Sequence, residues 1–274
     1  MSQLKIILID VAWGDSIFLE ATDSKGNEHY ALIDSNDSTN YKSSLIFLRK
    51  YFQKKFRTST FKKPLFDWIM LTHAHLDHGQ GLKEIMRTFK TKNFYYPKSL
   101  NSSSLAHLQN YANRDRINHQ AIDDNRSFPD FGDAKVKILW PEYNGSISDN
   151  ENNNSIVLTL TQDDKSCVLT GDAEEDVWNK IQHKIPTNTS FFKVPHHGSR
   201  NGSLDSAGNA TWTNYCPTSA ILGLSTHNRP FNHPHQEVLD EFDKKGFDHI
   251  RTDISYHIEV ILDNKQTVQC KYSR

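Results

Sequence analysis

The segment LTHAHLDHGQG, residues 71–81, constrains this chain more than any other stretch, because it places three histidines and one aspartate within six positions. The apolar run Trp68–Thr72 is typical of a buried strand, and Gly79 and Gly81 lead into a helical pattern. The four polar side chains therefore belong to a strand-to-helix loop, which can turn them toward one point. Imidazoles with a carboxylate suit zinc, and also manganese or iron. A solvated polar loop is the alternative, but it does not account for this spacing.

Apolar runs of strand length dominate both halves of the chain, and each half also carries helical spacing. This pattern favours two sheets packed on each other with helices outside, rather than a doubly wound parallel sheet. The predicted strands are Lys5–Val11, Ser16–Glu20, Tyr30–Asp34, Trp68–Thr72, Phe94–Tyr96, Val136–Trp140, Ser155–Leu160, Cys167–Thr170, Phe191–Val194, Ser219–Leu224 and His257–Leu262. The predicted helices are Lys42–Phe52, Leu82–Phe89, Leu105–Tyr111, Ala173–Ile181 and Gln236–Lys244. The polar segment Glu142–Asn154 is predicted to be a flexible surface loop.

The composition is that of an ordinary soluble protein, and we expect one domain, residues 1–274. The net charge of −1 gives no indication of a global polyanion-binding surface, although a local basic patch is compatible with it. No apolar run is long enough to span a membrane, and the N-terminus shows no signal-peptide pattern. Three cysteines without paired spacing argue against a disulfide framework. We therefore expect a cytoplasmic location.

Two later segments place polar residues at strand ends. In CVLTGDAEED, Asp172 follows an apolar strand directly. It is either a metal ligand or a helix cap, since a helical run follows and Glu175 lies three residues on. In FFKVPHHGS, His196 and His197 stand at the end of another apolar strand. The adjacent pair has no evident packing role there.

The H-x-H-x-D-H pattern of residues 73–78 resembles the motif of the metallo-β-lactamase fold superfamily. The resemblance calls for an aspartate at the end of a later strand and a histidine at the end of the strand after it. Asp172 and the His196–His197 pair meet that requirement. The resemblance also implies the fold: an α/β (α+β) four-layer αββα sandwich of two mixed β-sheets flanked by helices.

Further motifs resemble one branch of that superfamily, the hydrolase domain of ComEC-type DNA-internalisation proteins and their free-standing soluble relatives. In chain order the matching segments are IDVAWGDSIFLE, ALIDSN, NNNSIVLTL, LTGDAEED, KVPHHGS and FNHPHQEVLDEF. The chain departs from the branch at three turns. Ala12 and Trp13 replace Gly-Gln in the first turn, Ser35-Asn36 replaces Gly-Gly, and Asn232 replaces the glycine before His-Pro-His.

The resemblance implies a site for two divalent metal ions, zinc first and manganese as the alternative. His73 and His75 would bind the first ion, and Asp172 would bridge the two. The second ion would be bound by Asp77, His78 and one member of the His196–His197 pair. We expect His197 to be the ligand and His196 to face the substrate, although sequence alone cannot order adjacent residues. The superfamily's extra histidine is missing, so the first site is poor in protein ligands.

The remaining candidates surround this centre. The catalytic candidates are Asp77, His196, His233 and His235, and the substrate-binding candidates are Asn154, Ser155, Asn228 and Arg229. His233 and His235 would hold a phosphate or protonate a leaving alkoxide, unless they only cap a proline-rich loop. Three further groups each have two interpretations. One group either orients ligands or caps turns: Asp10, Asp15 and Asp34. A second either adds positive charge near the substrate or consists of surface cations: Lys193, Arg200 and Arg229. A third either stacks on bases or belongs to the core: Tyr111, Trp212 and Phe231.

These residues predict a hydrolase that uses a metal-bound hydroxide. The branch resemblance favours a phosphodiesterase or nuclease acting on nucleic acid or a small phosphodiester. Hydrolysis of carboxylic esters, thioesters or lactams on the same dinuclear site is the first alternative, since the fold does not decide function. A non-catalytic metal-binding module is the second. The physiological substrate, the protein partners and the oligomeric state are left open.

Overall fold

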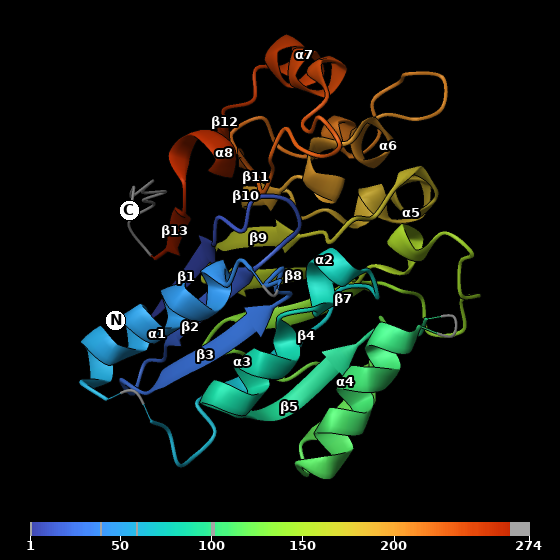
Figure 1. Cartoon of the computed structure of the whole chain (residues 1–274). Coiled ribbons are helices and arrows are strands. Elements are labelled where there is room, and N and C mark those ends of the chain that lie inside the picture. Colours follow the sequence, from blue (N-terminus) through green and yellow to red (C-terminus); the bar gives the residue numbers. More distant parts are fainter. Residues whose placement is uncertain (1, 39, 59, 100–101, 264–274) are drawn as a thin grey trace.

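The computed structural model describes residues 2–38, 40–58, 60–99 and 102–263. Two β-sheets lie face to face between helices, which confirms the predicted αββα arrangement (Figure 1). None of the helices in these ranges is both long and apolar enough to cross a membrane. The prediction of one domain for residues 1–274 stays a prediction.

The first sheet has seven strands in the order β13-β1-β2-β3-β4-β5-β6. They are β13 (Ile258–Leu262), β1 (Gln3–Leu8), β2 (Ile17–Thr22), β3 (Glu28–Ile33), β4 (Phe66–Met70), β5 (Thr91–Tyr96) and β6 (Asn118–Ala121). The pairs from β13 to β3 are antiparallel, and those from β3 to β6 are parallel. The sheet is therefore mixed.

The second sheet has six strands in the order β12-β11-β10-β9-β8-β7. They are β12 (His249–Arg251), β11 (Ile221–Leu224), β10 (Thr189–Lys193), β9 (Lys165–Leu169), β8 (Val157–Gln162) and β7 (Lys135–Trp140). The strands from β12 to β9 are parallel, and β8 pairs antiparallel with both β9 and β7. The carboxyl ends of β9, β10 and β11 therefore share one edge.

Helices cover the outer face of each sheet. Against the first sheet pack α1 (Ser43–Phe56), α3 (Leu82–Phe89) and α4 (Ser103–Arg114). Against the second pack α5 (Glu175–Ile181) and α7 (Gln236–Lys245). The short helices are α2 (Leu76–Gly79), α6 (Arg200–Ser203) and α8 (Thr252–Ser255), with 3-10 turns η1 (Glu151–Asn154), η2 (Gln182–Lys184), η3 (Pro195–Gly198) and η4 (Trp212–Asn214).

Alternation along the strands produces three apolar layers. Ile6 of β1 points into the core between the sheets, where it joins residues such as Leu158 and Phe191. Its neighbour Ile7 points outward into the core beneath α1, α3 and α4. A third core, which includes Trp178, lies beneath α5 and α7. The rigid layers leave the loops at the strand ends free to carry polar side chains.

Two strands escaped sequence analysis for a common reason. Both β6 and β12 lie at the edge of a sheet, and their sequences, NHQA and HIR, lack an apolar alternation. The segment Glu142–Asn154 also departs from its expectation. Its last three residues, Asn152–Asn154, are buried within η1 rather than part of a flexible surface loop.

Candidate metal centre

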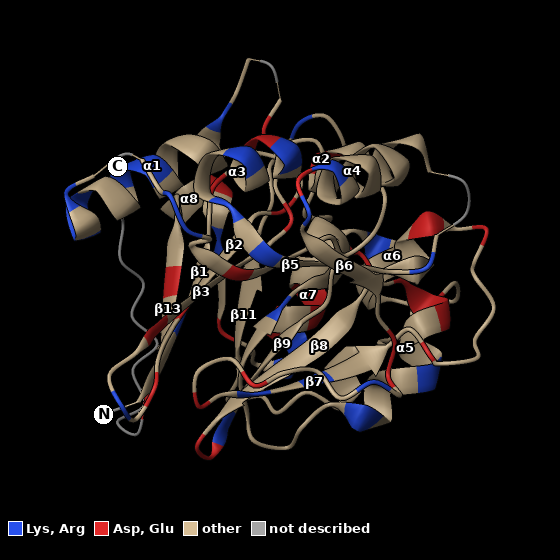
Figure 2. Ribbon diagram, turned by 90° about the horizontal axis from the view of Figure 1, so that it is seen from below, with Lys and Arg blue, Asp and Glu red and all other residues tan. Residues whose placement is uncertain are grey.

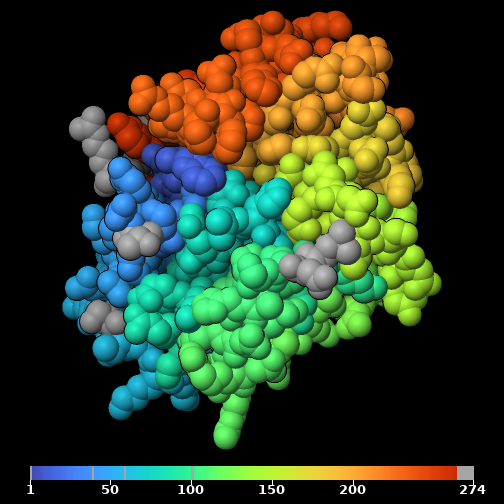
Figure 3. Space-filling model, turned by 45° about the vertical axis from the view of Figure 1, so that its right-hand side comes forward, coloured from blue at the N-terminus to red at the C-terminus, as the bar shows by residue number. Residues whose placement is uncertain are grey.

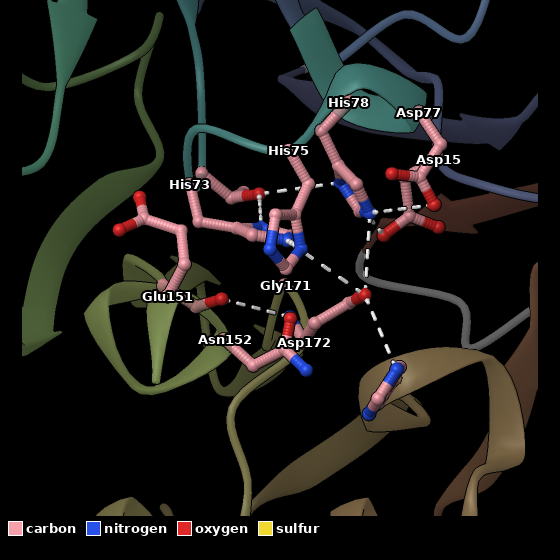
Figure 4. Close-up of polar contacts among 12 residues, drawn as sticks. Asp15, His73, His75, Asp77, His78, Glu151, Asn152, Gly171 and Asp172 are labelled. Carbon is pink, nitrogen blue, oxygen red and sulfur yellow. Dashed lines mark hydrogen bonds and ion pairs between the residues drawn. The ribbon is translucent and has the colours of Figure 1, made fainter. Parts of the chain in front are cut away.

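The predicted ligands converge where strands of both sheets end. His73 follows β4, and His75, Asp77 and His78 lie at the start of α2 or within it. Asp172 follows β9, and the His196–His197 pair follows β10. Figure 4 shows the imidazoles of His73 and His78 directed toward the Asp172 carboxylate, with His75 beside His73. Segments about one hundred residues apart in the chain thus form one cluster.

Asp172 is the centre of the cluster. Its Oδ2 lies 3.3 Å from Nε2 of His78 and 3.3 Å from Nε2 of His197. Nε2 of His73 is 3.9 Å away. Asp172 is not a helix cap, because α5 begins at Glu175 after the N-cap residue Glu174. The structure therefore places Asp172 as the carboxylate that the surrounding imidazoles share.

Partners on the far side of the rings fix the two closest imidazoles. Nδ1 of His78 lies 2.7 Å from Oδ2 of Asp34 and donates to it, which leaves Nε2 facing Asp172. Asp34 also accepts from the backbone N–H of Thr72 at 2.7 Å. Nδ1 of His197 donates to the backbone oxygen of Ser225 at 2.8 Å. Both rings thus turn Nε2 toward Asp172, where a bound metal ion would take the place of the proton.

The adjacent histidines differ in their surroundings. His197 is buried, with Nε2 at the centre, whereas the side chain of His196 is 21% exposed. Nδ1 of His196 lies 2.8 Å from Oε1 of Glu174, and its Nε2 is 4.0 Å from Asp172. Both residues have positive φ, 46° and 54°. Such backbone conformations cluster at functional sites.

The electrostatics of the centre favour an added cation. Burial alone raises the pKa of Asp172, but His197, His78 and His196 hold it well below the usual range, so the carboxylate is ionised. Burial lowers the pKa of His78, yet Asp172, Asp34 and Asp77 raise it well above its ordinary value. Burial and the charge of His78 keep the pKa of His73 well below normal, so its ring is neutral. A divalent ion would meet this demand for positive charge.

The residues fit divalent metal ions on the evidence of unpaired buried atoms. Nε2 of His78 and Nε2 of His197 are buried, and neither makes a hydrogen bond of ordinary geometry within the described ranges. A buried polar atom without a partner is costly, and a metal ion would satisfy it. Ligand atoms within 4.8 Å of one another form the sets His73–His78–Asp172, Asp77–His78–His197 and Asp15–Asp172–His197.

His75 completes the first segment at its exposed side. Its Nδ1 lies 3.1 Å from Nε2 of His73, and its side chain is exposed. His73 and His75 therefore lie side by side, with His75 next to solvent. The carboxylate of Asp77 is 3.9 Å from Nε2 of His78 on the other side.

The region that lacks the superfamily's extra histidine is filled by asparagines that point elsewhere. Asn154 donates to Glu151 and to the backbone oxygen of Ser148. Ser155 is fully buried, and its Oγ accepts from the backbone N–H of Asp172 at 3.0 Å. These bonds hold Asn154 and Ser155 within the protein, and substrate binding by these two residues stays a prediction. They also hold the loop that carries Asp172.

Glu174 is a site residue that sequence analysis missed. Besides its contact with His196, it accepts from Asn152 at 2.9 Å and from Asn150 at 2.8 Å. Burial raises the pKa of Glu174, but bonds from His196 and Asn152 bring it below its ordinary value. The acidic run GDAEED carried the only sequence signal, and it pointed equally to a helix start.

The loop of residues 225–235 closes one side of the centre. The His233 ring lies 5.5 Å from that of His196 and 6.4 Å from that of His197. Burial, together with the neighbouring imidazoles, lowers the pKa of His233 to about 4. Nδ1 of His235 accepts from the backbone N–H of Arg200, and Asn228 and Arg229 are exposed. His233 is therefore the residue of this group nearest the metal ligands.

Three aspartates of the N-terminal strands have separate roles. Asp34 orients His78, as described above. Asp10 accepts from the backbone N–H of Ala12 and so caps the first turn. Asp15 is fully buried, with Oδ1 3.7 Å from Nδ1 of His197 and Oδ2 2.5 Å from Nζ of Lys193.

Lys193 is not a surface cation, but it does place positive charge at the centre, because its Nζ lies 3.8 Å from Oδ1 of Asp172. Its side chain has no exposed area, and its Nζ donates to the backbone oxygen of Gly171 at 3.1 Å. Together with the Asp15 contact, this makes Lys193 a buried cation beside two carboxylates of the cluster. Arg200 pairs with Glu237 at 3.4 Å.

The chain resembles known proteins in both sequence and structure. ComE operon protein 3 of Bacillus subtilis (strain 168) is 28% identical over 96% of this chain, which spans 34% of that protein. Zn²⁺-bound PqqB from Methylobacterium extorquens superposes with a TM-score of 0.52 at 13% identity, over 95% of this chain and 99% of its own. CmlA, a diiron β-hydroxylase from Streptomyces venezuelae, gives 0.55 at 13% identity, over 94% and 54%.

These two structures share the fold at identities too low to indicate a shared function. The sequence match is more specific. Residues 66–211, which carry the first histidine segment, Asp172 and the His196–His197 pair, match the family described as the Metallo-beta-lactamase superfamily. This chain belongs to the metallo-β-lactamase superfamily, whose members are mostly metal-dependent hydrolases.

Proposed function

We propose that the protein is a metal-dependent phosphodiesterase that acts on nucleic acid or a small phosphodiester. The observation that carries the proposal is the convergence of imidazole nitrogens on the buried, ionised Asp172, beside an exposed rim. Structural metal sites are usually closed by four Cys or His ligands. This centre combines carboxylates with histidines, and His75 and His196 extend toward solvent.

Two groups of residues would hold the ions. His73 and Asp172, with His75 beside His73, would hold the first. Asp77, His78 and His197, together with Asp172, would hold the second. Divalent ions supply Lewis acidity and make water a stronger nucleophile. Zinc is the first choice for this donor set and manganese is the alternative. Of the two structures with a similar fold, PqqB binds zinc and CmlA is a diiron protein, so the fold alone does not determine the metal.

The chain's own side chains would bind and orient the diester. Glu174 holds Nδ1 of His196, so the opposite nitrogen of that ring points toward the centre. A neutral His233 can donate one N–H to a phosphate oxygen or to the leaving oxygen. His235 and the exposed Asn228 and Arg229 lie on the same loop and would contact the substrate farther from the reacting bond.

The charge distribution favours a short or single-stranded substrate. Figure 2 shows segments with Lys and Arg interspersed with segments that carry Asp and Glu. The net charge is −1. Binding a long duplex relies on a basic track that neutralises many phosphates. A nucleotide or single strand needs fewer such contacts.

Hydrolysis of bis-p-nitrophenyl phosphate tests the proposal. We expect turnover by the wild-type protein with zinc or manganese. The variants Asp172→Ala and His197→Ala should lose at least about 100-fold in kcat/KM, because each removes a central ligand. His107→Ala is the matched control, because His107 is an exposed histidine on α4, away from the cluster.

Three results would count against the proposal. Turnover of p-nitrophenyl acetate or of a lactam without any diester turnover would favour the ester or lactam alternative. Metal-replete protein inactive on both substrate classes would favour a binding module. Equal activity of Asp172→Ala and His107→Ala would remove the centre from the reaction.

A further inference from the structure

A cavity beside the metal centre has no role in the chemistry above. It measures about 310 Å³, at the lower end of the range for small-ligand sites, about 300–1,000 Å³. It lies between the turn from β1 to β2 and the loop from β3 to α1. Its lining residues are Asp10, Val11, Ala12, Trp13, Asn36, Ser38, Tyr41, Ser43, Gln80 and His227.

The cavity adjoins the metal ligands through Gly14. A Cβ added at Gly14 would lie 2.3 Å from the backbone oxygen of Asp77, so the first turn rests directly on the ligand segment. Gln80, which lines the cavity, follows that segment by two residues beyond His78. Figure 3 shows dark blue N-terminal residues at the surface between teal and orange residues, as this contact requires. The cavity therefore lies next to the segment that carries Asp77 and His78.

Aromatic rings line the way from the cavity to the centre. Trp13 meets Phe231 edge to face, with ring centroids 6.1 Å apart. Phe231 is 58% exposed, and its ring lies 5.9 Å from that of His233. In an edge-to-face contact, the edge of one ring meets one face of the other ring. At most one face of Trp13 is therefore covered by Phe231, and the other face is left for another planar group.

The polar lining suits an uncharged group with hydrogen-bonding edges. Asn36 donates to the backbone oxygen of Trp13 and accepts from the side-chain N–H of Gln80. The Gln80 amide keeps a carbonyl oxygen and a second N–H for a ligand, as far as the described residues show. The lining includes the carboxylate Asp10 but no Lys or Arg among the described residues, so it does not suit a phosphate.

We propose that this cavity, with Trp13 as its stacking wall, binds the nucleobase of the substrate. The proposal rests on the phosphodiesterase function proposed above and names its substrate class as nucleotidic. The phosphodiester would occupy the metal centre while the base stacks on Trp13 and meets the Asn36 and Gln80 amides. Base–aromatic stacking is tolerant of sequence, so we expect little discrimination between bases.

Tryptophan fluorescence tests the pocket without any turnover. Trp13 is partly exposed, whereas the other four tryptophans, Trp68, Trp140, Trp178 and Trp212, are buried. We expect thymidine and adenosine to change the emission of the wild-type protein in a saturable way, and ribose 5-phosphate to leave it unchanged. A response to ribose 5-phosphate equal to that of the nucleosides, or no response to either nucleoside, would overturn the proposal.

A kinetic test uses two diesters with the same leaving group, thymidine 5′-(p-nitrophenyl phosphate) and methyl p-nitrophenyl phosphate. The preference for the first, as a ratio of kcat/KM values, should fall about 5- to 100-fold in Trp13→Ala and recover in Trp13→Phe. The control is Tyr215→Ala, because Tyr215 is an exposed aromatic residue outside the cavity lining. An unchanged ratio in Trp13→Ala would refute the pocket.

The two tests separate failure of this inference from failure of the proposed function. Nucleoside binding without diester hydrolysis would retain the pocket and reject the phosphodiesterase. Hydrolysis of both diesters with no base preference and no fluorescence response would retain the phosphodiesterase and reject the pocket.

Discussion

At the scale of single residues, buried carboxylates decide how the imidazoles point. Asp34 is fully buried and in the left-handed region, with φ of 58°. It accepts from His78, from the backbone N–H of Thr72 and from the Thr72 hydroxyl. Partners of this kind orient a ligand histidine and raise its basicity. Asp34 should therefore matter for metal affinity although it is not among the proposed ligands.

The variant Asp34→Ala should lower metal affinity about 10- to 100-fold, because His78 loses the partner that fixes its tautomer. Competition with a chromogenic chelator measures the change. Asp67→Ala is the matched control, since Asp67 pairs with Nδ1 of His29 at 2.8 Å in the same manner but outside the cluster. Equal affinities in the two variants would mean that Asp34 does not orient a ligand.

At the scale of elements, turns position the centre by close backbone approach. The turn between β1 and β2 packs against Asp77, because a Cβ at Gly14 would lie 2.3 Å from the Asp77 backbone oxygen. On its other side, the Ser225 hydroxyl donates to the Gly14 backbone oxygen at 2.9 Å. Gly171, before Asp172, has φ of 52° and would place a Cβ 2.9 Å from that of Ser155. Loops from both sheets therefore meet with no room for side chains between them.

Gly14→Ala should destabilise the protein by about 1–3 kcal/mol more than Gly26→Ala does, because only the first creates an overpacked contact. The two glycines are well matched. Their φ angles are 88° and 84°, but an added Cβ at Gly26 meets nothing within 4 Å. Urea unfolding of both variants gives the two free energies. Similar losses would show that the positive φ, not the close approach, requires glycine at position 14.

At the scale of the whole molecule, the proposed ions would join segments that follow strands of both sheets. His73 and His78 come after β4 of the first sheet, and Asp172 and His197 after β9 and β10 of the second. A ligand that binds only the folded state stabilises it by about 2.7 kcal/mol at one hundred times its dissociation constant. Metal binding should therefore stabilise the fold as well as build the centre.

Removal of metal should lower the melting temperature, and zinc or manganese should restore it. Differential scanning calorimetry of chelated and reloaded protein measures the shift. In Asp172→Ala the shift should be much smaller, because the shared ligand is gone. A full shift in that variant would place the stabilising ion elsewhere.

Stability should also depend on pH through Glu20. Burial raises the pKa of Glu20, but hydrogen bonds from Lys55 and Tyr51 and the charge of Lys5 bring it below its ordinary value of 4.5. The ionised carboxylate is therefore stabilising above pH 4.5, and this contribution is lost as pH falls through the lowered pKa.

Glu20→Gln should cost about 1–2 kcal/mol at pH 7, and its deficit should shrink as the solution becomes more acidic than pH 4.5. Denaturant unfolding at several pH values follows the difference. Glu84→Gln is the control and should cost less than about 1 kcal/mol, because Glu84 pairs with the exposed Arg87 on the surface of α3. A Glu20→Gln deficit that does not change with pH would rule out this linkage.

Local sequence patterns predict many of the strands, helices and site-bearing loops of this protein. Apolar alternation predicted the central strands, and helical spacing gave α3 its observed bounds, Leu82–Phe89. The ligand-bearing loops could also be predicted, because each polar segment directly follows an apolar strand. Edge strands β6 and β12 escaped, since a strand at the edge of a sheet needs no apolar pattern.

Only the tertiary structure distinguishes the roles of residues that are neighbours in the sequence. His196 and His197 are indistinguishable by position, but the fold buries one against Asp172 and pairs the other with Glu174. Tyr111 and Trp212 belong to the core, whereas Phe231 is exposed. Trp13, only a departure from a motif in the sequence, lines a cavity beside the centre. The local sequence pattern determines which polar residues follow the end of a strand. Burial and long-range contacts determine the direction in which each of those side chains points.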